Sequence, residues 1–267
     1  MILAIDVGNT HISFGCVQAD GFVGQVFQMA TDPAETGFGY AARMQQILAL
    51  GGVETAALEG AVLSCVVPPA LDAVRSAVQL LTGQQPLTVG AGVKTGLPLA
   101  IDDPGDLAGD LVAAAVAARA EYPLPCIIVD MGTATTVTVV DENGRYIGGC
   151  ILPGAGIALH ALAQNAALLP RIDITPPQKA IATNTLDSMK AGIVFGSAGA
   201  VDGILDRYAA ALGREPASIV ATGGLCGAVC PHCRHDIRCD ATLVLKGLGI
   251  LWRKNRPLRS AAAPPNE

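Results

Sequence analysis

The sequence predicts an α/β protein made of two similar domains, each a mixed β-sheet flanked by helices. The main evidence is an internal repeat, because residues 2–17 read ILAIDVGNTHISFGCV and residues 126–140 read CIIVDMGTATTVTVV. Such self-similarity indicates a duplicated structural unit. In addition, a further apolar strand-like segment follows in each half, and helical segments with clear start signals lie between the strands. The aligned positions of the repeat are Asp6 with Asp130 and Gly8 with Gly132.

Each copy of the repeat is expected to form a β-hairpin around a turn large enough for a phosphate. An apolar run enters a D-x-G turn, a second β-rich run follows, and a polar turn with glycine ends the unit. In the second copy that polar turn contains Asn143-Gly144, a pair typical of hairpins.

A further buried strand is predicted in each half, at residues 61–67 and at 218–221. The first precedes a helix that opens with two prolines, and the second ends at a Thr-Gly-Gly turn. Each half thus holds a hairpin followed by further strand and helix units, which is enough for a domain. The expected divisions are an N-terminal domain at 1–118, a C-terminal domain at 119–256 and a disordered tail at 257–267.

Three helices are predicted from residues that favour helix starts. Aspartate followed by proline occurs at residues 32–33 and 103–104, where aspartate can cap free N–H groups and proline fits the first turn. Thr185 is the predicted N-cap of the third helix. The expected helices are 32–50, 104–120 and 185–212.

Glycine recurs at helical spacing inside the third predicted helix, at positions 192, 196, 199 and 203. Each glycine in a helix costs about 1 kcal/mol relative to alanine, so we expect a compensating close approach. Our interpretation is helix–helix packing, either between domains or between subunits.

The composition excludes several classes of function. With a formal net charge of −6 and one short basic cluster at 253–259, the chain lacks the positive footprint of a nucleic-acid-binding protein. No apolar stretch reaches the roughly 20 residues that span a bilayer, and the first residues do not resemble a secretory signal. Several of the eight cysteines lie within apolar runs, as reduced thiols of cytoplasmic proteins do. We expect a cytoplasmic protein with no nucleic-acid or membrane partner.

The D-x-G turns have the composition of phosphate-binding loops. Backbone N–H groups must converge on a phosphate, glycine keeps side chains out of their way, and Thr or Asn adds donors. A single D-x-G also occurs in ordinary turns, but the repeated pair with a downstream Thr-Gly-Gly favours phosphate binding. Asp6 and Asp130 would add a hard anionic site for Mg²⁺. The residues assigned to ATP are Asp6, Gly8, Asn9, Thr10, Gly132, Thr133, Gly223 and Gly224.

The motifs D-x-G-N-T, D-x-G-T-A and T-G-G, in this order, resemble those of the actin-like kinase superfamily. Over nearly its whole length the chain resembles the type III pantothenate kinases. The segments that carry this resemblance are 6–10, 64–68, 94–98, 102–104, 130–136, 148–154, 166–170, 184–185, 222–224 and 243–248.

The resemblance implies two ribonuclease H-like domains of the actin-like ATPase type, with the active site in the cleft between them. It implies ATP-dependent phosphorylation of pantothenate to 4'-phosphopantothenate, the first step of coenzyme A biosynthesis. It also implies Mg²⁺, a monovalent cation (K⁺ or NH₄⁺) and a homodimer.

The resemblance also suggests the substrate-side residues. Asp110 matches the acid that takes the proton from the substrate hydroxyl, and Thr185 matches a substrate-contacting threonine. Gly109 and His160 are further substrate-side candidates. Independently of the resemblance, a carboxylate early in a helix that borders the cleft can orient and deprotonate an alcohol. Alternatively, an aspartate in the first turn pairs favourably with the helix dipole.

One position departs from the family pattern Gly-Ala-Asp-Arg, because Leu111 follows Asp110. Arginine can bind a carboxylate through two hydrogen bonds, and leucine cannot replace it. Asn165 stands where the family often carries an arginine, so it does not compensate. Two alternatives therefore stay open: a non-catalytic nucleotide-binding paralogue that acts as a sensor or accessory protein, and a kinase of another small metabolite.

A cysteine-rich segment at 226–239 raises the question of a metal site. Cys230 and Cys233 have the C-x₂-C spacing of a zinc knuckle, and Cys239 offers a third ligand. No second C-x₂-C pair follows, so we favour ordinary reduced thiols and do not expect zinc.

Overall fold

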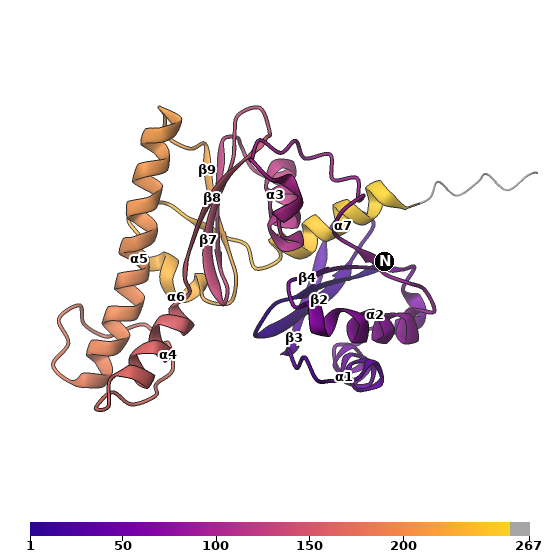
Figure 1. Ribbon diagram of the computed structural model, residues 1–267, viewed down its shortest axis with the longest axis horizontal. Helices are drawn as coiled ribbons and strands as arrows, with labels where there is room; N and C mark the ends of the chain where they lie inside the picture. The colour runs from indigo at the N-terminus through magenta and orange to yellow at the C-terminus, as the bar shows by residue number, and fades with distance from the viewer. Residues whose placement is uncertain (257–267) are drawn as a thin grey trace, which may run out of the picture.

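The computed structural model describes residues 1–256 and contains two five-stranded mixed sheets with helices around them (Figure 1). The predicted fold class is confirmed. The predicted disordered tail at 257–267 lies outside the described residues.

The first sheet has the strand order β3-β2-β1-β4-β5. Strands β1, β2 and β3 form an antiparallel meander, whereas β4 and β5 run parallel to β1. The bounds are β1 Ile2–Val7, β2 His11–Val17, β3 Val23–Ala30, β4 Ala61–Cys65 and β5 Leu87–Thr88.

The second sheet repeats this topology, with the order β8-β7-β6-β9-β10 when read from the meander side. Strand β6 takes the place of β1, pairing antiparallel with β7 and parallel with β9. The predicted duplication therefore extends to the order and direction of every strand. The bounds are β6 Cys126–Met131, β7 Ala134–Val140, β8 Tyr146–Pro153, β9 Ser218–Thr222 and β10 Arg238–Cys239.

Helix α1 (Gly37–Leu50) packs with α2 (Pro68–Thr82) against the first sheet (Figure 1). The prediction for α2 is confirmed, since it opens at two prolines. The predicted start of α1 at residue 32 is wrong, because Asp32 caps a local turn by accepting from the Ala34 N–H at 3.0 Å. Thr36 is the N-cap and accepts from the Gly39 N–H at 3.1 Å.

Helix α3 (Gly109–Glu121) begins five residues later than predicted. Residues Pro104–Asp106 form a separate 3₁₀ turn, which Asp103 caps by accepting from the Gly105 N–H at 2.9 Å. Aspartate before proline thus marks a turn here rather than the start of the helix.

Helices α3 and α7 (Leu243–Asn255) lie between the two sheets (Figure 1). They cross closely at Gly247, where a Cβ would lie 1.9 Å from the Ala113 carbonyl oxygen. Side chains of both helices and of both sheets share one apolar core. The predicted domain boundary at residue 118 falls inside α3 and stays a prediction.

Helix α5 has the predicted bounds, Thr185–Leu212, and covers the outer face of the second sheet, where α4 (Ala155–Asn165) packs beside it (Figure 1). Its N-cap is Asn184 rather than Thr185, since the Asn184 side chain accepts from the Asp187 N–H at 2.9 Å. A Cβ at Gly192, Gly196 or Gly199 would meet nothing within 4 Å. Packing between domains at these glycines is therefore excluded, and packing between subunits stays a prediction.

After β9 the chain forms short helix α6 (Cys226–Val229) and a 3₁₀ turn (Cys230–His232), and then enters β10. A further 3₁₀ turn covers Thr55–Ala57. Within residues 1–256, no helix has the length and apolar character needed to cross a bilayer.

Candidate active site

The two D-x-G turns face each other, although they lie in different halves of the chain. The hydroxyl oxygens of Thr10 and Thr133 lie 2.8 Å apart and form a hydrogen bond. Within the first turn the Gly8 N–H donates to the His11 carbonyl at 3.0 Å, which closes the β1–β2 hairpin. Asn9, Thr10, Gly132 and Thr133 are exposed, so both turns are available to one ligand between them.

The predicted Thr-Gly-Gly turn packs against the second D-x-G turn. Gly223 has φ +90°, and a Cβ there would lie 2.5 Å from the Met131 carbonyl carbon and 2.7 Å from Asp130 Oδ1. Only glycine fits this position, because the left-handed conformation and the close backbone contact both exclude a side chain. All three predicted turns therefore meet at the ends of β1, β6 and β9.

Asp6 is the most perturbed carboxyl group of the site. Its register partner across the β1–β4 ladder is Ser64, and the Ser64 side chain lowers the pKa of Asp6, although the buried Asp6 Oδ1 and Ser64 Oγ atoms form no hydrogen bond of full geometry among the described residues. Burial, and then the negative charges of Asp110 and Asp130, raise the pKa of Asp6 to about 8.

Asp130 and Asp110 complete a group of three interacting carboxylates. Burial and the charge of Asp110 raise the pKa of Asp130 to about 6, and burial raises the pKa of Asp110. Within residues 1–256 no Lys, Arg or His forms an ion pair with any of the three. A cation would remove the repulsion among these carboxyl groups and favour their ionised forms, so the arrangement favours cation binding.

The start of α3 positions Asp110. Gly109 lies against the end of β4, since a Cβ there would be 3.2 Å from Ser64 Oγ and 3.3 Å from the Val89 Cβ. Asp110 is the next residue, and its Oδ1 accepts from the Leu111 N–H at 2.8 Å. The predicted substrate-side Gly109 thus has a packing role that brings Asp110 beside Asp6.

Sequence reasoning assigned no role to two residues that border the site. Gly154 packs on the second D-x-G turn, because a Cβ there would lie 2.1 Å from the Thr133 carbonyl oxygen. Tyr146 is buried, and burial followed by the charge of Asp110 raises its pKa to about 12. The Pro153-Gly154 pair indicates a turn and could have pointed to Gly154. Tyr146 lies in strand β8, where no local sequence pattern marks it.

A family model described as type III pantothenate kinase matches residues 2–207. The chain belongs to the type III pantothenate kinase family. A relative from Moorella thermoacetica, named type III pantothenate kinase, is 39% identical over 255 residues, which cover 96% of this chain and 100% of the relative. Another relative of that name, from Geobacter sulfurreducens, is 38% identical over 256 residues and equally well covered.

Among solved structures, the chain is similar to an activator of 2-hydroxyisocaproyl-CoA dehydratase from Clostridium difficile with bound ADPNP. The TM-score is 0.57 and the identity 12%, and the match covers 94% of this chain and 93% of that one. At this identity the likeness concerns the fold alone, and it confirms the predicted actin-like ATPase architecture.

In this type III pantothenate kinase family member, two predicted substrate residues lie apart from the carboxylates. His160 on α4 and Thr185 at the start of α5 are both exposed. Within the described chain neither residue is hydrogen-bonded or ion-paired with Asp6, Asp110 or Asp130. Leu111 is half-buried beside Asp110 and brings no charge to it.

Proposed function

We propose that this chain transfers a phosphoryl group from ATP to the hydroxyl of pantothenate, in the cleft where Asp6, Asp110 and Asp130 converge. The observation that carries the proposal is the hydrogen bond between Thr10 and Thr133, since it joins the two D-x-G turns around one space. Membership of the type III pantothenate kinase family supports the choice of substrate.

The backbone N–H groups of the two turns would bind the triphosphate. The N–H groups of Asn9 and Thr10 contribute from one side and those of Gly132 and Thr133 from the other, and these four residues are exposed. Gly8, whose N–H closes the hairpin, would keep side chains away from the phosphates. Gly223 and Gly224 would lie against the nucleoside, because their turn packs next to Asp130.

The carboxylates fit a magnesium ion. Asp6 offers a buried carboxylate oxygen beside Ser64, and the charge of Asp130 acts on it. No group of three or more His, Cys, Asp or Glu in residues 1–256 is arranged to hold a metal by itself. This suits Mg²⁺, which usually takes one or two carboxylates together with substrate phosphates. Bound there, Mg²⁺ would neutralise charge on the triphosphate.

Asp110 would act as the general base. Its raised pKa makes it a better proton acceptor than an exposed aspartate, and its position beside the other carboxylates puts it near the phosphates. It would hold the substrate hydroxyl and take its proton as the new O–P bond forms. The required K⁺ or NH₄⁺ stays a prediction from the resemblance, tested by replacing K⁺ with Li⁺ in the assay.

A homodimer is also proposed, with the α4–α5 side as the contact surface. Large apolar side chains are exposed around it, with Ile151 at 76%, Leu168 at 94% and Ile181 at 87%. Light scattering during gel filtration would give twice the chain mass, and a monomer would refute this part.

The test of the proposed function is ADP release by purified protein with Mg-ATP and K⁺, with and without pantothenate. We expect release to depend on pantothenate. Nucleotide binding without any pantothenate-dependent release would favour the non-catalytic paralogue, for which Leu111 is the supporting observation. Release with another small alcohol in place of pantothenate would favour a different metabolite kinase.

A further inference from the structure

Four cysteines gather on the segment that directly follows the Thr-Gly-Gly turn. Cys226, Cys230 and Cys233 are four and three residues apart in consecutive helical turns, so they share one face. Cys239 comes from β10, where it pairs with Ala221 next to that turn. The thiols are therefore neighbours in space as well as in sequence.

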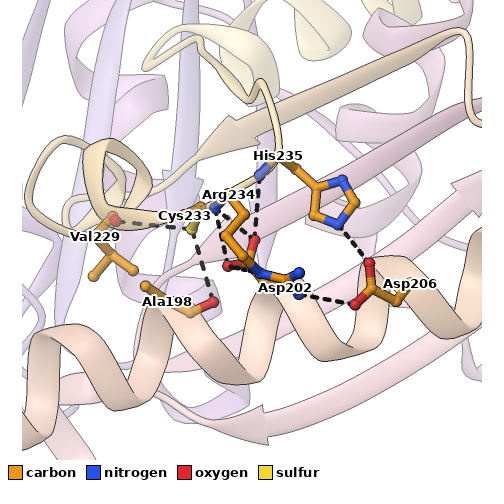
Figure 2. Close-up of polar contacts among 7 residues, drawn as sticks. All are labelled: Ala198, Asp202, Asp206, Val229, Cys233, Arg234 and His235. Atoms are coloured by element: carbon orange, nitrogen blue, oxygen red, sulfur yellow. Dashed lines mark hydrogen bonds and ion pairs between the residues drawn. The ribbon is translucent and has the colours of Figure 1, made fainter.

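The contacts among these thiols centre on Cys239. Its side chain interacts electrostatically with the thiols of both Cys226 and Cys230. Cys239 is exposed, whereas Cys226 and Cys230 are buried. Cys233 differs, because its thiol lies 3.8 Å from the Val229 carbonyl oxygen and 3.9 Å from that of Ala198, and donates to both (Figure 2). The exposed Cys239 thiol therefore lies near two buried thiols, those of Cys226 and Cys230.

The segment is held firmly on α5. Asp202 accepts backbone N–H bonds from Arg234, at 2.9 and 3.0 Å, and from His235 at 3.4 Å (Figure 2). Asp206 pairs with the side chains of the same two residues at 2.9 and 2.8 Å. Because this part of the segment is anchored, the strain of a new bond between the thiols would act on its other end.

That other end of the segment is the Thr-Gly-Gly turn. The Cys226 N–H donates to the Gly223 carbonyl at 3.3 Å, and the Asp240 N–H donates to the Ala221 carbonyl at 2.7 Å. Cys226 is thus hydrogen-bonded to the Thr-Gly-Gly turn, and Cys239 pairs with β9 just before that turn. A change in their separation would act on Gly223, which packs against the Met131 backbone of the second D-x-G turn.

The geometry favours a disulfide over a metal site. The described residues include no group of three or more ligand side chains arranged to hold a metal. Instead, the Cys239 thiol interacts with the Cys226 thiol and, separately, with the Cys230 thiol. Burial, and then the neighbouring Cys239, raise the pKa of Cys226 to about 11, so this thiol is protonated in the resting protein. Oxidation would therefore begin at the exposed Cys239.

We propose that Cys239 forms a reversible disulfide with Cys226 or Cys230, and that this disulfide weakens ATP binding at the adjoining turn. Hydrogen peroxide serves as the two-electron oxidant. The Cys239 thiol is oxidised to a sulfenic acid while peroxide is reduced to water. The buried thiol then attacks the Cys239 sulfur, an S–S bond forms, and the S–O bond breaks to release a second water. A dithiol reductant reverses the step. The effect on ATP rests on the proposed function, but the disulfide does not.

The experiment treats the full chain with peroxide and maps its peptides by mass spectrometry without reduction. We expect one disulfide joining the Cys239 peptide to the Cys226 or Cys230 peptide, and its absence in Cys239→Ser. Cys233→Ser is the matched control and should keep the disulfide, because the Cys233 thiol contacts carbonyl groups. ATP titration of the oxidised protein should show a Kd several-fold higher than before, restored by dithiothreitol.

Three other outcomes would overturn the proposal. A sulfinic acid at Cys239 without any disulfide refutes the pairing, and a disulfide with unchanged ATP affinity refutes the regulation. A stoichiometric amount of Zn²⁺ that protects all four thiols would show a metal site instead. If the reduced protein shows no pantothenate-dependent ADP release, the proposed function fails while the peptide map still decides the disulfide.

Discussion

Gly223→Ala tests the packing of the Thr-Gly-Gly turn against the second D-x-G turn. An alanine at φ +90° carries about 1–2 kcal/mol of backbone strain. The added Cβ would also lie 2.5 Å from the Met131 carbonyl carbon and 2.6 Å from its oxygen, which are backbone atoms that a rotamer change cannot move away. The strain and the clash together should lower the free energy of unfolding by about 3 kcal/mol.

The same displacement should weaken ATP binding, because the turn moves away from Asp130. If the displaced turn no longer contacts the nucleotide, the Kd for Mg-ATP should rise about tenfold or more, which corresponds to about 1.4 kcal/mol. Urea unfolding gives the stability and calorimetric titration gives the affinity.

Gly227→Ala is the matched control. It lies four residues away on α6, where a Cβ would meet nothing within 4 Å and φ is not positive. Its stability should be unchanged or slightly higher, since alanine favours helix. Equal behaviour of the two variants would refute the close-packing argument for Gly223.

Three further predictions concern the carboxylates and their neighbour. Asp110→Asn should lower turnover at least about 100-fold with ATP affinity nearly unchanged, as measured by ADP release and titration, and unchanged turnover would remove Asp110 from the base role. Leu111→Arg should lower the KM for pantothenate about tenfold by restoring a fork for its carboxylate, and an unchanged KM would mean that the substrate lies elsewhere. In the folded, nucleotide-free protein the pKa of Asp6 is about 8, which is above its value in the unfolded chain. The folded protein therefore binds more protons than the unfolded chain between these two pKa values. Its free energy of unfolding should consequently fall as pH rises from about 4 to 8. Urea unfolding of Asp6→Asn should show a smaller fall, and an identical pH dependence in both proteins would contradict the burial of that charge.

The sequence predicted the strands better than the helix starts. An apolar run that enters a D-x-G turn and a β-rich run that follows it predict a hairpin, and the repeat implied that both halves share one topology. Helix starts at 32 and 103 were misplaced because Asp32 and Asp103 accept from N–H groups two residues ahead, at 3.0 and 2.9 Å. An aspartate that caps a short turn and one that caps a helix look alike in sequence.

The parts of the site that are local in sequence were predictable, and the parts that depend on register were not. The D-x-G turns and the Thr-Gly-Gly turn each carry their own signal. Ser64 reaches Asp6 only through the β1–β4 pairing, and Tyr146 reaches Asp110 only through packing of β8 near α3. Such contacts join segments that no sequence window contains.

Mg-dependent ATP binding by Asp6→Asn and Asp130→Asn, compared by calorimetry with the unaltered protein, addresses the shared nucleotide site most directly. One ATP per chain should bind to the unaltered protein, and each substitution alone should weaken that binding strongly, although the two residues lie in different halves of the chain. Full-strength ATP binding in either variant would contradict a site built from both turns.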